Sequence, residues 1–178
     1  RPEDVVGMHF FSPANVMRLL EIVKTKRASK ESLATAMAVG KRLGKVCVIA
    51  GNSDGFIGNR IFRAYRKQAD YLVEDGAMPW AVDRIMRAFG FAMGPFETSD
   101  LAGLDIGWHT RRREDATRDP RERYVAIADL LYEKGRLGQK TGAGWYKYDE
   151  ARNASVDPEV EAIILSAAAE KGVRRRDF

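Results

Sequence analysis

The pattern of apolar residues changes character near residue 50 of the chain. Before this point, apolar residues come in short runs rich in β-branched types, which are typical of buried strands. The runs predict strands over residues 5–11, 18–24 and 46–50, with a helix over residues 29–43 before the last of them. Strand, strand, helix and strand make an α/β arrangement that is too small to be an independent sheet domain.

After the turn at residues 51–55, apolar residues recur at helical spacing. This spacing predicts helices over residues 57–73, 79–90, 123–134 and 158–171, and one longer helical stretch from residue 95 that frays by Asp119. The glycines of residues 135–148 fit neither the Walker pattern nor GxGxxG, so we expect a structural loop whose aromatic side chains cover the helical core. The predicted fold class is an α/β edge followed by a mainly α-helical domain.

Composition narrows the class of protein. The 178 residues suit one domain, or one domain with a piece of another, and a 45% hydrophobic content suffices for a packed core. No run approaches the roughly 18 apolar residues of a membrane span, so we expect no membrane partner. Cys47 is the single cysteine, which excludes an internal disulfide and favours a cytoplasmic (bacterial) location or another reducing compartment.

The net charge of +5 suits an anionic ligand such as a phosphorylated cofactor. Basic residues are dispersed apart from the runs at residues 111–113 and 174–176, and neither run is interleaved with aromatic residues as in single-strand binders. We therefore interpret both runs as solvated helix ends and expect no nucleic-acid partner. The first residues, Arg-Pro-Glu-Asp, have neither an initiator methionine nor a signal sequence, so we expect the chain to be cut from a longer polypeptide.

Two polar residues stand out within the predicted strands, His9 and Glu21. Oxidation of a secondary alcohol requires a base for the hydroxyl proton, and histidine suits this task because its reference pKa is about 6.5. A carboxylate bound to the other ring nitrogen fixes the tautomer and favours the imidazolium. A lone histidine in an apolar strand is more often structural, so both interpretations stay open. A buried Glu21 needs a partner, however, and His9 is the obvious one.

Three further observations concern candidate chemistry. Asn59 lies in the first turn of a predicted helix, where local capping is the alternative to a role in holding substrate. His109 lies between Trp108 and Arg111 on a charged helix, and we expect no catalytic role for it. No cluster of residues has metal-ligand spacing, so we predict no metal site.

Three motifs carry a resemblance to a known family: HFFSP at residues 9–13, DGFIGNR at 54–60 and MGPFE at 93–97. In order and spacing they resemble the L-3-hydroxyacyl-CoA dehydrogenase family over essentially the whole chain. The segments SPANVM at 12–17 and GQKTGAGWY at 138–146 look most like the dehydrogenase part of multifunctional fatty-acid β-oxidation proteins. In those proteins this module follows an enoyl-CoA hydratase domain and precedes a second helical copy.

The resemblance implies three catalytic residues: His9 as general base, Glu21 as its charge partner and Asn59 as a group that holds substrate and developing product. It implies NAD as cofactor, with binding residues unknown, and oxidation of an L-3-hydroxyacyl-CoA to a 3-oxoacyl-CoA in fatty-acid β-oxidation. Residues 1–52 would be the C-terminal part of the NAD-binding Rossmann domain, and residues 53–178 the helical C-terminal domain. The expected partners are an acyl-CoA substrate and either a second copy, as a homodimer, or a fused hydratase and second helical domain.

The family's glycine-rich fingerprint does not occur in the chain, and the family's catalytic serine lies upstream of His9. We therefore expect the chain to carry half a site and to be inactive by itself. The alternative function is a helical oligomerisation or docking module without catalysis. The two hypotheses differ on one point: an enzyme requires His9 and Glu21 within hydrogen-bond reach, and a docking module does not.

Overall fold

The structure is a computed structural model that describes residues 1–176. It divides into two compact units, the first comprising residues 1–64 and the second beginning at Tyr65. Each unit has a hydrophobic core of its own. Among residues 1–176, no helix is both long and apolar enough to cross a membrane.

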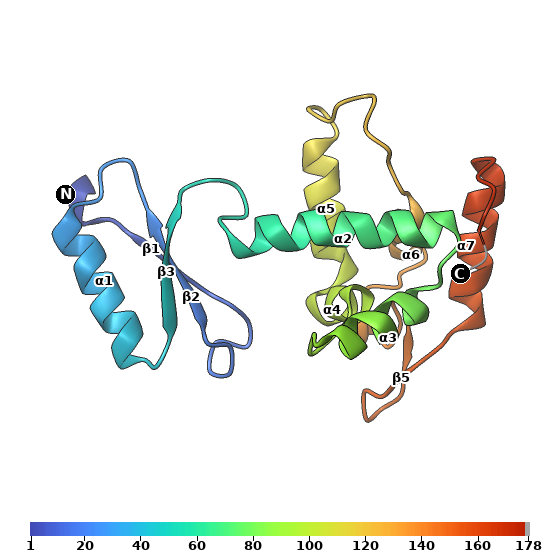
Figure 1. Cartoon of the computed structure of the whole chain (residues 1–178), viewed down its shortest axis with the longest axis horizontal. Helices are drawn as coiled ribbons and strands as arrows, with labels where there is room; N and C mark the ends of the chain where they lie inside the picture. The colour runs from blue at the N-terminus through green and yellow to red at the C-terminus, as the bar shows by residue number, and fades with distance from the viewer. Residues whose placement is uncertain (177–178) are drawn as a thin grey trace. The chain divides into compact units, whose positions relative to one another are not determined.

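The first unit is a three-stranded sheet with one helix against it (Figure 1). Its elements are β1 (Gly7–Phe10), β2 (Leu19–Lys24), α1 (Lys30–Arg42) and β3 (Val46–Gly51), after a short 3-10 turn at Pro2–Asp4. The strands lie in the order β1-β2-β3, with β1 antiparallel and β3 parallel to β2. The predicted strands and helix are confirmed, although β1 is shorter at both ends than the apolar run from residue 5 to residue 11.

Helix α1 begins and ends where the sequence favours it. The Ser29 side chain caps its first turn by accepting from the amide of Ser32 at 3.0 Å. At the other end Gly44 adopts a left-handed φ of 71°. The helix buries Leu33 against Leu20 and Ile22 of β2, which have no exposed surface. This core covers one face of the sheet and leaves the side chains at alternate positions of β2 to the opposite face.

The second unit is mainly helical, as predicted. Its elements are α3 (Pro79–Phe89), α4 (Pro95–Ala102), α5 (Leu104–Glu114), α6 (Ile127–Glu133) and α7 (Pro158–Glu170), with a 3-10 turn at Gln139–Thr141 and the short strands β4 (Lys147–Tyr148) and β5 (Ala154–Ser155). Helix α2 (Gly58–Asp75) contains the boundary between the two units.

Two helix predictions in this unit are wrong in detail. The stretch from residue 95 is two helices, because Gly103 takes a φ of 101° and a ψ of 127° that interrupt the helical path. The helix predicted from residue 123 begins only at Ile127. Just before it, the carbonyl of Arg123 accepts from the Tyr71 hydroxyl and is not part of a helix.

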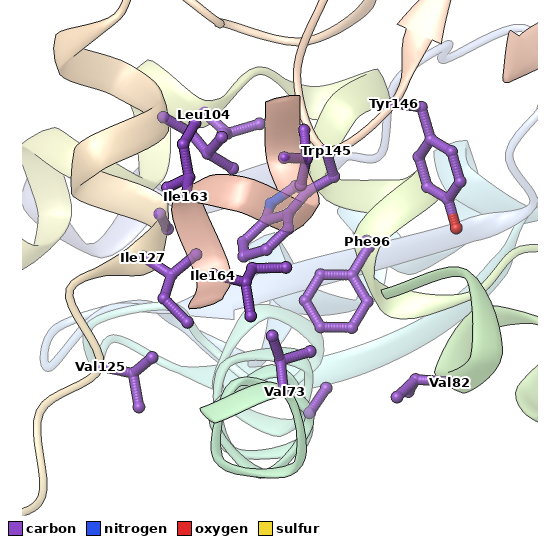
Figure 2. Close-up of a cluster of buried hydrophobic side chains, with 14 of the residues drawn as sticks. Val73, Val82, Phe96, Leu104, Val125, Ile127, Trp145, Tyr146, Ile163 and Ile164 are labelled. Atoms are coloured by element: carbon purple, nitrogen blue, oxygen red, sulfur yellow. The ribbon is translucent and has the colours of Figure 1, made fainter. Parts of the chain in front are cut away.

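The loop at residues 135–148 was expected to cover the helical core with its aromatic residues, and Trp145, Tyr146 and Tyr148 in fact belong to the buried cluster itself. Trp145 is fully buried and packs on Phe96 with ring centroids 4.6 Å apart. Figure 2 shows these two rings among Val73, Ile163 and Ile164. The guanidinium of Arg66 lies 4.4 Å from the centre of the Phe96 ring, so one cation belongs to the core.

The interpretation of the two arginine runs as solvated helix ends is wrong for one residue in each. Arg111 donates two hydrogen bonds to Asp129, at 2.8 and 2.5 Å. Arg175 donates to the carbonyls of Val73 and Gly76 at 2.8 and 2.7 Å, where helix α2 ends. The carbonyls at a helix C-terminus lack intrahelical donors, and a cation there is favourable.

Candidate active site

The structure brings His9 and Glu21 together in the first unit. The two residues are direct partners in the antiparallel register of β1 and β2, so their side chains leave the same face of the sheet. The His9 Nδ1 and Glu21 Oε2 atoms are 2.7 Å apart. The Glu21 side chain is fully buried, whereas the His9 side chain keeps 30% of its surface exposed. The pair therefore has an inaccessible carboxylate and an accessible ring.

The second carboxylate oxygen of Glu21 is bound at the start of helix α2. Its Oε1 atom accepts from the amides of Ile57 and Gly58 at 3.0 and 2.8 Å. Burial raises the pKa of Glu21, but the Gly58 amide, the His9 ring and the Ile57 amide outweigh it, so the pKa lies below its ordinary value. Glu21 is therefore ionised at neutral pH, and the favourable end of a helix dipole supports that charge.

An ionised Glu21 fixes the tautomer of His9. The carboxylate can only accept, so Nδ1 carries the proton and donates it to Glu21. The lone pair is then on Nε2, which has no hydrogen-bond partner among residues 1–176. Two aromatic rings flank the imidazole: the centroid of Phe11 lies 4.8 Å away and that of Phe56 lies 5.3 Å away. This geometry presents one basic nitrogen beside apolar walls.

Asn59 and His109 are not members of this hydrogen-bonded pair. Asn59 is exposed in the first turn of α2, one residue after Gly58, and bonds to neither His9 nor Glu21 in the structure. His109 is exposed on α5, where its ring lies 5.0 Å from that of Trp108. Sequence reasoning did not single out Phe56 and Gly58, although both lie within the DGFIGNR motif.

Two models of known protein families match the chain. Residues 1–53 match the 3-hydroxyacyl-CoA dehydrogenase NAD binding domain, and residues 55–148 match the 3-hydroxyacyl-CoA dehydrogenase C-terminal domain. The chain therefore belongs to the 3-hydroxyacyl-CoA dehydrogenase family, a family of oxidoreductases for which the NAD-binding domain indicates NAD as cofactor.

Three similar proteins are multifunctional enzymes or the dehydrogenase part of one. The chain is 48% identical to the peroxisomal bifunctional enzyme of Danio rerio, over 99% of this chain and 26% of that protein. It is 40% identical to a peroxisomal fatty acid beta-oxidation multifunctional protein of Arabidopsis thaliana, over 96% of this chain and 23% of that protein. Among solved structures, the dehydrogenase part of multifunctional enzyme 1 from C. elegans has a TM-score of 0.72 and 32% identity, covering 99% of this chain and 39% of that one.

The chain thus spans about a quarter of the length of these curated relatives. The expected bacterial cytoplasmic location is wrong, because these relatives are peroxisomal by name, although a bacterial fatty acid oxidation subunit is also similar. The expectation rested on the single Cys47. A lone cysteine bears on disulfide formation and does not distinguish one reducing compartment from another.

The residues present do not supply a pyrophosphate site for NAD. Such a site needs a glycine-rich turn from a parallel strand into a helix whose first amides are free. The turn from β2 to α1 contains no glycine. The turn from β3 to α2 contains glycines, but the amides of Ile57 and Gly58 at its end are bound by Glu21. The chemistry that these residues can perform is proton transfer at His9.

Proposed function

We propose that the protein carrying these residues oxidises an L-3-hydroxyacyl-CoA to a 3-oxoacyl-CoA, with NAD as hydride acceptor, in fatty-acid β-oxidation. The observation that carries this proposal is the pair formed by a partly exposed His9 and a fully buried, ionised Glu21. A base of this kind is what alcohol oxidation requires. The family and its multifunctional relatives support the substrate class.

The proposed step for this chain is removal of the proton from the 3-hydroxyl group. Nε2 of His9 accepts the proton, and the ring becomes an imidazolium. Glu21 stabilises that charge through its hydrogen bond with Nδ1, at 2.7 Å. It acts as a positioning residue, because the imidazole, with Phe11 and Phe56 beside it, lies between Glu21 and the substrate.

We propose that Asn59 holds an oxygen of the substrate, either the hydroxyl or the thioester oxygen. Its exposure at the start of α2, close in sequence to the amides that bind Glu21, supports this role. We also assign residues 1–52 to the C-terminal part of the NAD-binding domain and residues 53–178 to the helical domain. The adjoining family matches support this division.

For partners beyond acyl-CoA, we propose a homodimer or a fusion to a hydratase and a second helical domain. Exposed apolar side chains on α3 support an association: Phe89 is 79% exposed and Ile85 is 63% exposed. The alternative function, a docking module without catalysis, would depend on the same association. Light scattering measures it, and a monomer of the same mass at every concentration would contradict the dimer.

The experiment that tests the dehydrogenase is a steady-state assay of NADH formation from 3-hydroxybutyryl-CoA and NAD. Because residues 1–176 supply no pyrophosphate site, the assay uses the chain joined to the glycine-rich part of a family member's NAD-binding domain, and it compares wild type with His9→Ala. A general base contributes about 10²- to 10⁴-fold, so kcat should fall by that factor. His109→Ala is the matched control, since the chain has two histidines and His109 is exposed on another unit. Equal activity in His9→Ala and wild type would refute the proposal.

A further inference from the structure

The loop before helix α2 has an unusual backbone. Gly55 and Phe56 are consecutive residues with positive φ angles, 72° and 45°. Glycine adopts this region readily, but phenylalanine does so at a steric cost. Such strain persists only where surrounding contacts enforce it, and it is concentrated at functional sites.

Hydrogen bonds within the loop, and between the loop and helix α2, enforce this conformation. Arg63 on α2 donates twice to Asp54, each time at 3.1 Å. The amide of Phe56 donates to the carbonyl of Ser53 at 3.0 Å, and Arg60 donates to the Ser53 hydroxyl at 3.3 Å. The turn is therefore tied to the first turns of α2.

The consequence of the strained turn is that two successive amides, of Ile57 and Gly58, point at one atom. That atom is Glu21 Oε1, at 3.0 and 2.8 Å. Successive amides after a tight turn form an anion-binding concavity. Here the anion is internal, and its capture leaves Oε2 alone to accept from His9.

Gly58 is required at this place for lack of space, not for its φ. A Cβ atom on Gly58 would lie 2.8 Å from Cζ and 3.2 Å from Cε1 of the Phe11 ring, and 3.6 Å from Glu21 Oε1. The Phe11 ring in turn packs on His9. Any side chain at residue 58 would therefore displace a wall of the imidazole.

Phe56 provides the other wall. Its ring centroid lies 5.3 Å from that of His9, with the planes inclined by 55°. Phe56, the strained residue, thus packs against the proposed base His9. The next two residues along the chain bind Glu21, the carboxylate that orients His9. One short segment controls both the position of the ring and the hydrogen bond to it.

We propose that residues 55–58 form a positioning element for His9, in which Phe56 and Gly58 are positioning residues that set the ring orientation and tautomer of the base. This inference rests on the proposed function of His9. It extends that function by assigning roles to two residues that act through His9.

The first test is Gly58→Ala, with Gly51→Ala as the matched control in the same unit. A Cβ at Gly51 meets nothing within 4 Å, and its φ is not positive. Alanine is the better helix former, so the change does not weaken α2 itself, and its expected effect comes from displacement of the Phe11 ring. As a positioning residue, Gly58→Ala should lower kcat about tenfold to 10²-fold with KM nearly unchanged, because small misplacements of a base are costly.

The second readout is independent of turnover. Nitrogen NMR of the imidazoles is simple because the chain has two histidines, and His109→Gln identifies the signals of His9. Wild type and Gly51→Ala should show one tautomer with a protected Nδ1–H. Gly58→Ala should show mixed tautomers. An unchanged tautomer in a folded Gly58→Ala protein would overturn the inference, whatever the activity.

Phe56→Gly keeps the test decisive if Gly58→Ala does not fold. Glycine relieves the positive φ, so a purely structural Phe56 would leave kcat within about twofold of wild type. The positioning role predicts a fall in kcat and loss of Nδ1–H protection in spite of that relief. The tautomer is measured on the chain itself, and turnover is measured on the chain joined to the glycine-rich part of an NAD-binding domain. If the joined wild type shows no turnover although the Nδ1–H signal is present, the proposed function fails, while the effect of these variants on the tautomer still decides the inference.

Discussion

Both units of the molecule bury carboxylates, and Glu21 of the sheet unit behaves differently from Asp100, one of several in the helical unit. Glu21 in the sheet unit has no exposed surface, and Asp100 in the helical unit keeps 1%. Each accepts from two backbone amides. Asp100 accepts from the amides of Trp145 and Tyr146 at 2.9 and 3.0 Å. Burial and backbone contacts are therefore shared, and they do not distinguish a chemical group from a structural one.

The difference lies in the third partner. Glu21 has an ionisable histidine, whereas Asp100 accepts from the hydroxyl of Tyr148 at 2.9 Å. Burial raises the pKa of Asp100 to about 6, because the amides and the hydroxyl offset only part of the desolvation. The pKa of Glu21 is lowered instead. We propose that Glu21 serves proton transfer because its partner can take up a proton, whereas Asp100, whose partners are neutral donors, serves the fold.

The largest effect should follow from removing the structural carboxylate. Asp100→Ala leaves three buried donors, on Trp145, Tyr146 and Tyr148, without their acceptor. Each unsatisfied group costs about 1–3 kcal/mol, so the free energy of unfolding should fall by about 4 kcal/mol. Urea unfolding followed by tryptophan fluorescence measures this change.

The control for that experiment is Asp119→Ala. Asp119 is exposed and bonds to Arg121 two residues away, so its loss should change the free energy of unfolding by no more than about 0.5 kcal/mol. Equal stability losses in the two variants would show that the loop around Trp145 does not depend on Asp100.

The second effect, on the catalytic side of the comparison, should follow from Glu21→Gln. The amide oxygen can still accept from Ile57 and Gly58, which directs the amide NH₂ group toward His9 Nδ1. The ring would then carry its proton on Nε2 and lose its basic nitrogen there. We expect kcat to fall about 10²-fold, at the lower end of the contribution of a general base.

Steady-state kinetics at saturating substrate check this prediction, and circular dichroism checks the fold. The comparison sharpens if Glu21→Gln loses activity while its melting temperature changes little, and Asp100→Ala does the reverse. Full activity in Glu21→Gln would mean that the carboxylate does not set the tautomer of His9.

Much of the fold follows from periodicity. The strands β1, β2 and β3 and the helices α1, α3 and α7 were predicted within a few residues, because glycine, proline and capping residues mark the helix ends. The two-residue strands β4 and β5 were not predicted. Periodicity alone did not find the break at Gly103, since the apolar spacing continues across it. A glycine inside a helical pattern is tolerated as often as it interrupts one, and its φ is decided by tertiary contacts.

One part of the site, the pairing of His9 with Glu21, was predictable from the charge of the carboxylate. A carboxylate in an apolar strand demands a partner, and that argument alone pairs Glu21 with His9. The second set of contacts was not predictable. The amides of Ile57 and Gly58 carry no side-chain signal, and the positive φ of Phe56 arises from contacts across the turn and not from its residue type.

The smallest predicted effect is the pH dependence of stability. The folded-state pKa of Asp100 is raised from 3.8 to about 6, so the folded protein binds a proton more tightly than the unfolded chain does. The stabilisation is complete below the unfolded value and is lost as the pH rises through about 6. Between about pH 5 and pH 7, this should lower the free energy of unfolding by about 1 kcal/mol.

The pH dependence of stability that Glu21 contributes has the opposite sign and lies in a different pH range. Its pKa is lowered from 4.5, so its contribution is present above that value and is lost only as the pH falls through the lower folded value. The contribution of Glu21 is therefore constant between about pH 5 and pH 7. Burial also raises the pKa of Asp83, so the comparison of wild type with Asp100→Asn is needed to separate the contribution of Asp100 from that of Asp83. Chemical denaturation at both pH values should show a larger loss of stability from pH 5 to pH 7 in wild type than in Asp100→Asn. Equal losses would place the titration of Asp100 outside this range and remove the electrostatic contrast between the two carboxylates.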